Sequence, residues 1–293
     1  EQVVPVLETA RDWQWGDRRV GPRLVGMQLE GPFLNREQSG AQPPSDIFAP
    51  PAGIAAWVLD HADVITQITL APELPGALDL IREVARAGIL VAAGHSQATE
   101  PEVVAAMEAG LRHVIHIFSS MSTVIRRGPW RVPGLLECAL VYDELTTEMI
   151  ADLCHLPPTL MRLVLKCKAP DKLCLVSDAM RGAGRPEGDR FLMGGQEVII
   201  EEGVAQLPDR TSFAGSVTPL DTMLRNVVRE LGVPLEQAIR LVTLNPARIL
   251  GIEGWTGSIE TGKKADLVLL DENLEVAVTL VEGQVVYRAG SKG

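Results

Sequence analysis

Short apolar runs that favour β-strands alternate with longer helical patterns from about residue 24 onward, and this alternation limits the fold more than any other feature. Two of the helical patterns end at a glycine, Gly88 and Gly110, and Thr99 is a suitable N-cap for the second. Strands that alternate with helices form βα units, whose strands pair in parallel. We therefore expect a parallel α/β sheet with six strands, at residues 24–30, 64–70, 88–95, 113–118, 148–153 and 172–178.

The pattern changes after the sixth predicted strand. Residues 191–209 predict a β-hairpin, and residues 219–232 and 234–251 predict two helices. The tail from residue 257 is rich in strand-forming residues and contains several turn signals. It predicts a small antiparallel β unit.

These segments predict two domains. Residues 1–252 would form the main domain, with a hairpin insertion at about 190–209, and residues 253–293 would form a small β domain. The chain has 293 residues, of which 46% are hydrophobic, so a sizeable core can be buried.

Composition and motif content exclude several classes of protein. The net charge of −11 would repel a nucleic-acid backbone from most of the surface. No apolar run approaches the roughly 20 residues that a membrane-spanning helix needs, and the first residues do not resemble a secretory signal. We expect a soluble cytoplasmic protein with no nucleic-acid or membrane partner. The four cysteines contain no CxxC pair and are expected to be reduced, and no dinucleotide, phosphate-loop or serine-hydrolase motif is present.

Five side chains that can do chemistry lie at or next to the C-terminal ends of different predicted strands: Glu30, His95, His116, His155 and Asp178. In a parallel α/β barrel these ends share one face, where such enzymes keep their active sites. A carboxylate and two imidazoles suit a divalent ion such as Zn²⁺ and leave an open position for water. Asp178 is then the candidate base. The other two histidines receive structural assignments, His61 at a helix end and His113 at the base of a strand.

Each candidate also has a purely structural interpretation. Glu30 could cap a turn, and Asp178 could be the N-cap of the segment that follows it. His95 and His116 could be core histidines bonded to the backbone, and His155 could serve packing as readily as substrate binding. The placement of all five at one face of the sheet favours a metal site over these separate explanations.

The sequence also resembles a known family, the N-acetylglucosamine-6-phosphate deacetylases of the amidohydrolase superfamily. The matching blocks occur in order over almost the whole chain. The last block is common among amidohydrolases, whereas the combination of the others is highly specific. The blocks are LEGPFLN (29–35), TLAPE (69–73), GHSQAT (94–99), HIFSSM (116–121), RVPG (131–134), IADLCH (150–155), LVSDAM (175–180), AGS (214–216), TLNPAR (243–248) and GSIETGKKADLVLLD (257–271).

The resemblance implies a fold, a cofactor and a reaction. The fold would be a (β/α)8 TIM-like barrel with a small β-sandwich unit. Glu30, His95 and His116 would ligate a divalent metal ion, with Zn expected first and Fe, Mn, Co or Ni as alternatives. Asp178 would activate water and then protonate the leaving amine. The implied reaction is hydrolysis of N-acetylglucosamine 6-phosphate to glucosamine 6-phosphate and acetate.

The resemblance also implies the substrate contacts and a partner. His155 would hold the sugar, and Ser119 and Ser120 would receive the phosphate of this amino sugar phosphate. Arg131 would reach the phosphate from the neighbouring subunit. The protein is therefore expected to be a homodimer whose active site is shared.

Three positions depart from the family pattern. Gln42 stands where the family has a histidine that helps to polarise the acetyl carbonyl; its amide can donate a hydrogen bond but cannot carry a proton. Ser119 replaces an asparagine, and Leu153 replaces a glycine. These departures leave two alternatives open: a related amidohydrolase for another N-acyl amino sugar, or a non-catalytic sugar-phosphate-binding paralogue.

The six predicted strands correspond to the third through eighth strands of the family's barrel. The family's opening β segment and first two barrel strands have no counterpart, so the chain is expected to begin inside the second barrel helix. A barrel that lacks two strands cannot close and has two exposed edges.

Overall fold

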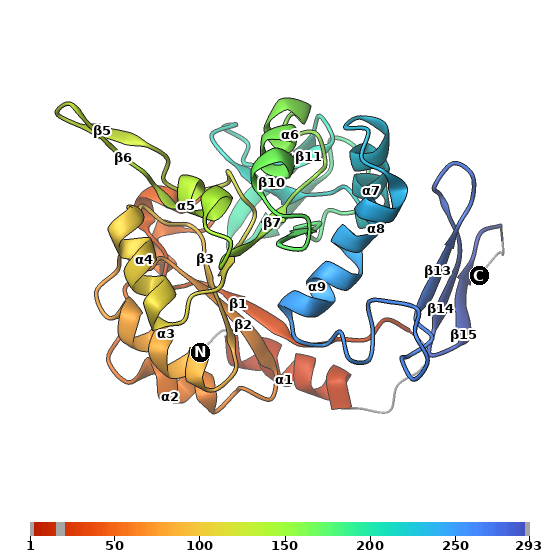
Figure 1. Ribbon diagram of the computed structural model, residues 1–293, viewed down its shortest axis with the longest axis horizontal. Coiled ribbons are helices and arrows are strands. Elements are labelled where there is room, and N and C mark those ends of the chain that lie inside the picture. Colours follow the sequence, from red (N-terminus) through yellow and green to blue (C-terminus); the bar gives the residue numbers. More distant parts are fainter. Residues whose placement is uncertain (1–2, 16–20, 291–293) are drawn as a thin grey trace.

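The apolar runs between residues 27 and 175 form the strands of one parallel sheet (Figure 1). The computed structural model describes residues 3–15 and 21–290. The sheet has six strands in the order β1-β2-β3-β4-β7-β8, which confirms the six predicted strands. They are β1 (Met27–Glu30), β2 (Ile65–Leu70), β3 (Leu90–Ala93), β4 (His113–Val114), β7 (Thr146–Met149) and β8 (Leu173–Leu175).

All six strands are shorter than their predicted ranges, and the structure gives a reason for β4 and β7. β4 is only two residues long, because the backbone turns soon after it: His116 and Phe118 have left-handed φ angles of 22° and 74°. β7 begins at Thr146 rather than at residue 148, since Thr146 pairs with the first residue of β4. It ends at Met149, so the residues after it form a loop. Both changes lengthen the loops at the C-terminal edge of the sheet, where the candidate residues lie.

Helices pack against the sheet through their apolar faces. In α3 the residues Leu80, Ile81 and Val84 are buried. α4 begins with a capping box between Thr99 and Glu102, which confirms Thr99 as its N-cap. The helices are α1 (Val3–Trp15), α2 (Ile54–Leu59), α3 (Ala77–Arg86), α4 (Glu100–Ala109), α5 (Leu135–Val141), α6 (Pro158–Cys167), α7 (Leu220–Arg229), α8 (Leu235–Val242) and α9 (Leu244–Ile249), with short 3-10 helices at Arg36–Gln38 and Pro44–Asp46.

The second helix predicted after the insertion, at residues 234–251, is in fact two helices, α8 and α9. Thr243 interrupts them with φ −131° and ψ −86°. The break brings the buried Asn245 to the end of the sheet, where its amide donates to the carbonyl groups of Pro170 and Leu173, both at 2.7 Å. These tertiary hydrogen bonds compensate for the interruption, which the helical periodicity could not indicate.

The predicted hairpin is part of a four-stranded antiparallel sheet. Its strands are β9 (Arg190–Met193), β10 (Gln196–Glu201), β11 (Val204–Gln206) and β12 (Phe213–Ser216). A small second core forms beneath it from Phe191, Val198 and Ile200 with neighbouring alanines. Ser216 also pairs with Ala179, so this sheet is anchored directly beside Asp178.

A second hairpin projects from the body of the molecule (Figure 1). It consists of β5 (Ile125–Arg127) and β6 (Trp130–Val132) and carries Arg131. Trp130 is 74% exposed. The predicted substrate-binding arginine therefore lies on an exposed arm.

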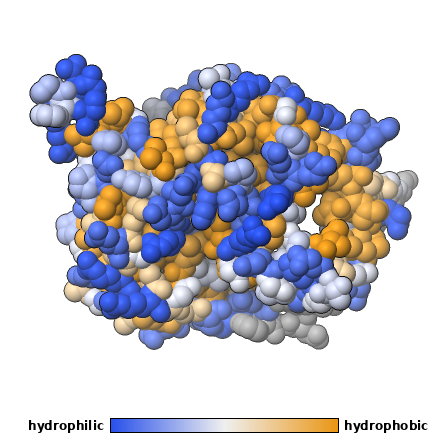
Figure 2. All heavy atoms as spheres, viewed as in Figure 1, coloured by the Kyte–Doolittle hydropathy of each residue, from blue (hydrophilic) through white to orange (hydrophobic). Residues whose placement is uncertain are grey.

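The tail forms a three-stranded antiparallel sheet of β13 (Leu267–Leu270), β14 (Val276–Val281) and β15 (Gln284–Arg288). Apolar atoms face solvent over these strands (Figure 2). Arg23 ties the sheet to the main body through ion pairs with Asp266 and Glu282. The described tail is a single sheet, and the domain boundary and the second layer of a sandwich stay predictions.

Within residues 3–15 and 21–290, β1 and β8 form the two edges of the parallel sheet, because each is paired on one side only. The loss of two barrel strands stays a prediction. No helix in this part of the chain combines the length and apolar character needed to cross a membrane. All four cysteines have free thiols, as expected: Cys138 and Cys174 are buried, Cys154 is half-buried and Cys167 is exposed.

Candidate metal centre

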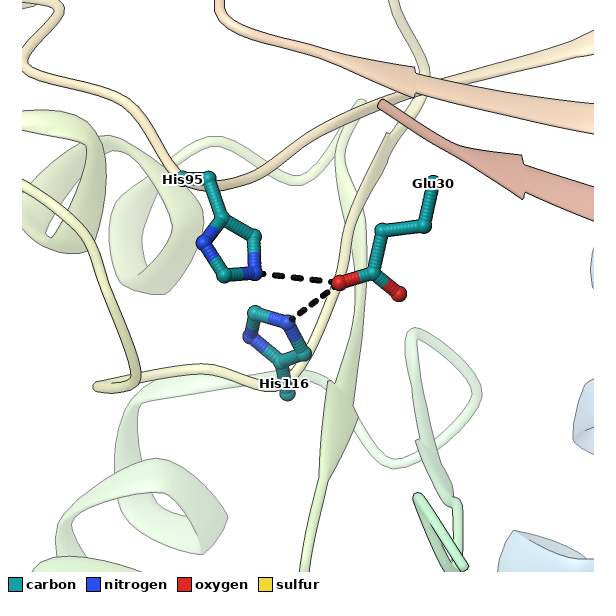
Figure 3. A group of neighbouring side chains, drawn as sticks. All are labelled: Glu30, His95 and His116. Atoms are coloured by element: carbon teal, nitrogen blue, oxygen red, sulfur yellow. Dashed lines mark hydrogen bonds and ion pairs between the residues drawn. The ribbon is translucent and has the colours of Figure 1, made fainter. Parts of the chain in front are cut away.

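Three strand ends bring one carboxylate and two imidazoles together (Figure 3). Glu30 is the last residue of β1, and His95 and His116 each follow their strand by two residues. The Nε2 atoms of His95 and His116 lie 3.0 Å and 3.5 Å from the same carboxylate oxygen, Oε1 of Glu30. One ligand atom from each residue lies within 4.8 Å of the others. Nitrogen and oxygen donors in such a set suit a divalent ion, so the cluster could hold a metal.

His95 is oriented by a second hydrogen bond. Its Nδ1 donates to the carbonyl oxygen of Gln38 at 2.7 Å, which leaves Nε2 to face Glu30. The loop that carries Gln38 passes so close that a Cβ on Gly40 would lie 3.2 Å from the His95 ring. Gly40 also has φ +58°, a conformation that glycine adopts without strain. Nδ1 of His116, by contrast, is buried without a hydrogen-bond partner in the described part of the chain.

The carboxylate and the imidazoles change each other's pKa. Burial would raise the pKa of Glu30, but the hydrogen bonds and charges of His116 and His95 outweigh it and hold this pKa well below its usual range. Burial would lower the pKa of His116, but the Glu30 carboxylate raises it to about 9. The metal-free cluster at neutral pH is therefore an ion pair. A divalent cation would compete with the proton on His116.

The loops that carry the cluster adopt a rare backbone conformation. His95, His116, Ser120 and Asp178 have φ angles of 48°, 22°, 47° and 47°. Positive φ in a residue other than glycine costs about 1–3 kcal/mol and persists only where the surroundings enforce it. One enforcing contact is the hydrogen bond from the backbone N–H of His116 to Oε2 of the buried Glu148, at 3.3 Å. Such concentrations of strain are typical of functional sites.

Asp178 follows β8 and lines the same pocket as the cluster. Within the described residues its carboxylate accepts no hydrogen bond. Burial raises its pKa; the charge of His116 opposes this rise, and the charge of Glu30 adds to it. Its backbone carbonyl accepts from the N–H of Ser216 at 2.9 Å. A Cβ on Gly215 would lie 2.9 Å from the same carbonyl oxygen, so only glycine permits this approach. The AGS block thus fixes the loop that carries Asp178.

A pocket of about 470 Å³ joins these groups. Eight of the nine predicted site residues line it: Glu30, Gln42, His95, His116, Ser119, Ser120, His155 and Asp178. Arg131, on the projecting hairpin, does not line it. Met193 of β9 and Phe213 of β12, which were not predicted as site residues, bring the inserted sheet into the pocket wall. The AGS block directly after Phe213 was the signal that could have found this wall.

Residues 18–286 match the amidohydrolase family. The chain belongs to this family. The amidohydrolase is 34% identical over 270 residues to an N-acetylgalactosamine-6-phosphate deacetylase of Escherichia coli O157:H7, an alignment that covers 90% of this chain and 69% of that protein. It is 32% identical over 292 residues to the N-acetylglucosamine-6-phosphate deacetylase of Bacillus subtilis (strain 168), and this alignment covers 97% of this chain and 71% of that protein.

Solved structures agree with this family assignment. The amidohydrolase superposes on the N-acetylglucosamine-6-phosphate deacetylase of Pasteurella multocida with a TM-score of 0.89 and 31% identity, covering 97% of this chain and 72% of that one. A mutant of the N-acetyl-D-glucosamine-6-phosphate deacetylase of Mycobacterium smegmatis, in complex with N-acetyl-D-glucosamine-6-phosphate, gives a TM-score of 0.88 at 31% identity. This superposition covers 97% of this chain and 72% of that one. The amidohydrolase therefore has an α/β fold of the TIM-barrel type. Its family is metal-dependent, which agrees with the Glu-His-His cluster.

Proposed function

We propose that this chain hydrolyses the N-acetyl amide of N-acetylglucosamine 6-phosphate to give glucosamine 6-phosphate and acetate. The observation that carries the proposal is the convergence of Glu30, His95 and His116 with Asp178 on one pocket. Its volume of about 470 Å³ falls in the range of small-molecule sites. The relatives named above act, by their names, on N-acetylated amino sugar phosphates, which supports this substrate class.

Glu30, His95 and His116 are the proposed ligands of a divalent metal ion. The convergence of both Nε2 atoms on one carboxylate oxygen supports this assignment. We propose Zn²⁺, because two nitrogens and one oxygen leave a fourth tetrahedral position open; Fe, Mn, Co and Ni accept similar donors. When bound, such an ion polarises the amide carbonyl and lowers the pKa of water.

Asp178 is the proposed general base and acid. Its carboxylate lines the pocket, and its raised pKa makes it a stronger base than an exposed aspartate. It takes one proton from the attacking water. It then gives that proton to the amide nitrogen as the C–N bond breaks, so that the amine leaves neutral and Asp178 is ionised again.

Two further pocket residues are proposed to hold the acetylated sugar. Gln42 would donate an amide hydrogen to the acetyl carbonyl oxygen, where negative charge develops in the transition state. His155 would contact the sugar. Both residues line the pocket from loops outside the metal cluster.

Ser119 and Ser120 are proposed to receive the phosphate, and Arg131 of a second copy to complete this site. Arg131 is exposed and lies outside the pocket of its own chain. Val124, Ile125 and Trp130 next to it are also exposed, and an apolar surface on a projecting arm supports association. We therefore propose a homodimer.

Acetate release tests the proposal. The purified chain would be stripped of metal, supplied with Zn²⁺ and incubated with N-acetylglucosamine 6-phosphate. Metal-dependent release of acetate is the expected result. Binding of the sugar phosphate without release would instead support the non-catalytic paralogue.

A specific departure keeps a second candidate open, a related hydrolase for another N-acyl amino sugar phosphate. Gln42 and Ser119 replace the family's histidine and asparagine, and one relative carries the name of a galactosamine enzyme. A panel of N-acetylglucosamine, N-acetylgalactosamine and N-formylglucosamine 6-phosphates distinguishes the two. Highest kcat/KM on the first substrate supports the main proposal, and highest kcat/KM on another replaces it.

A further inference from the structure

The carboxylate of Asp152 is a buried group that the reaction above does not use. It lies in the loop after β7, and its side chain has no exposed surface. It accepts hydrogen bonds from the backbone N–H groups of Cys154 and His155, at 2.9 Å and 2.8 Å. It also accepts from Nδ1 of His155 at 2.7 Å and from the hydroxyl of Ser216. Four donors match the lone pairs that one carboxylate offers.

The surrounding loop fixes the ring of His155 in one orientation. The ring packs against Phe213 with 4.9 Å between centroids, and the His155 side chain is only 5% exposed. The residue lines the pocket although its Nδ1 is engaged by Asp152. Nε2, on the far side of the ring from Nδ1, is therefore the ring nitrogen left for a ligand in the pocket.

The hydrogen bonds decide which nitrogen of His155 carries the proton. Burial would raise the pKa of Asp152, but the hydrogen bond and charge of His155, with the backbone and Ser216 donors, outweigh it and lower this pKa. An ionised carboxylate can only accept, so Nδ1 of His155 must donate. In the neutral ring Nε2 then has a lone pair and no hydrogen. It can accept a hydrogen bond from a ligand but cannot donate one.

We propose that Asp152 is a positioning residue that holds His155 in the Nδ1–H tautomer, so that Nε2 accepts a hydrogen bond from a hydroxyl group of the bound sugar. The identity of the sugar rests on the proposed function. The chemical requirement is more general: the ligand must present an O–H donor at this point, and an ether or carbonyl oxygen there would face a lone pair.

The Asp152→Asn variant tests the role of the carboxylate. Its amide oxygen can still accept the two backbone N–H groups and keep the turn. Its NH₂ would face Nδ1 of His155 and favour the opposite tautomer, with hydrogen on Nε2. We expect kcat/KM for N-acetylglucosamine 6-phosphate to fall by about 10- to 100-fold, because two donors then oppose each other at the sugar. The melting temperature is expected to change little.

Nitrogen-15 NMR of the histidine rings reads the tautomer without any turnover. His155 is assigned from the signals that disappear in the His155→Gln variant. In the wild-type protein Nε2 of His155 is expected to be of the unprotonated type and to shift on addition of N-acetylglucosamine 6-phosphate. In Asp152→Asn it is expected to become protonated. An unchanged tautomer in Asp152→Asn, or no response of Nε2 to the sugar phosphate, would overturn the proposal.

A double-mutant cycle separates positioning from folding. If Asp152 acts through His155, Asp152→Asn should add little to the loss already caused by His155→Gln. An undiminished further loss would show that Asp152 acts on the loop instead. Asp209→Asn is the matched control, because Asp209 closes a similar turn to Thr211 on an exposed loop. Failure of acetate release by the wild type would refute the proposed function alone, since the tautomer of His155 in the ligand-free wild-type and Asp152→Asn proteins is read without any turnover.

Discussion

Glu148 accepts a hydrogen bond from Nε2 of His113 at 2.9 Å, and both side chains are buried beside the cluster of Glu30, His95 and His116. The other oxygen of Glu148 accepts from the backbone N–H of His116. His113 also contacts the hydroxyl of Thr146 at 2.7 Å through Nδ1. A residue that we placed at the base of a strand thus connects, through one carboxylate, to a predicted metal ligand.

Removal of this carboxylate is expected to be costly. Glu148→Ala leaves Nε2 of His113 and the backbone N–H of His116 buried without their hydrogen-bond partner and should lower the free energy of unfolding by about 3–5 kcal/mol. Chemical denaturation of the metal-free proteins measures the change. Glu197→Ala removes a carboxylate from the exposed pair with Arg190 and should cost about 1 kcal/mol or less. Equal losses in the two variants would contradict the structural role of Glu148.

Asp178→Asn separates proton transfer from metal binding. The amide cannot take a proton from water, so kcat should fall by about 10²- to 10⁴-fold. The metal content should stay the same, because Asp178 lies outside the Glu30, His95 and His116 cluster. Metal analysis and acetate release on the same preparation provide the two values. Asp189→Asn, at an exposed ion pair with Arg185, is the control. Full activity of Asp178→Asn would remove Asp178 from its proposed role.

Metal binding should depend on pH through His116. The pKa of this residue is raised from 6.5 to about 9 in the metal-free protein. Its contribution to the free energy of unfolding of the metal-free protein is therefore fully present below pH 6.5 and is lost as the pH rises through about 9. A metal needs the neutral ring. Affinity should therefore rise about tenfold per pH unit in this window and level off above it. Calorimetry at pH 7 in buffers of different ionisation enthalpy should detect release of about one proton for each metal ion bound. Metal binding without proton release would contradict the assignment.

Gln42 should act on the acetyl group rather than on the metal. Gln42→Ala removes the donor proposed for the carbonyl oxygen and should lower kcat by about 10²- to 10³-fold with unchanged metal content. Gln42→His restores a donor and should retain much more activity than Gln42→Ala. If Gln42→Ala turned over as fast as the wild type, carbonyl polarisation would have to come from other groups.

Local patterns in the sequence were sufficient for the sheet and for the five candidate residues at strand ends, whereas Gln42, Ser119, Ser120 and Arg131 came from the family resemblance. Each strand is an apolar run, and Glu30, His95 and Asp178 each end or follow one, so the geometry of parallel strands predicts that they meet. The helix break at Thr243 could not be predicted, because it is compensated by Asn245 bonding to carbonyl groups more than 70 residues away in the chain.

The sequence by itself determined the parallel α/β architecture and the residues that gather at the C-terminal edge of the sheet, because apolar periodicity decides which runs become strands. Only the tertiary structure decided how those residues are held. The partners of His155 and His116, the left-handed loops, and the entry of Met193 and Phe213 into the pocket depend on hydrogen bonds and packing between different elements. Such contacts leave no periodic signal along the chain.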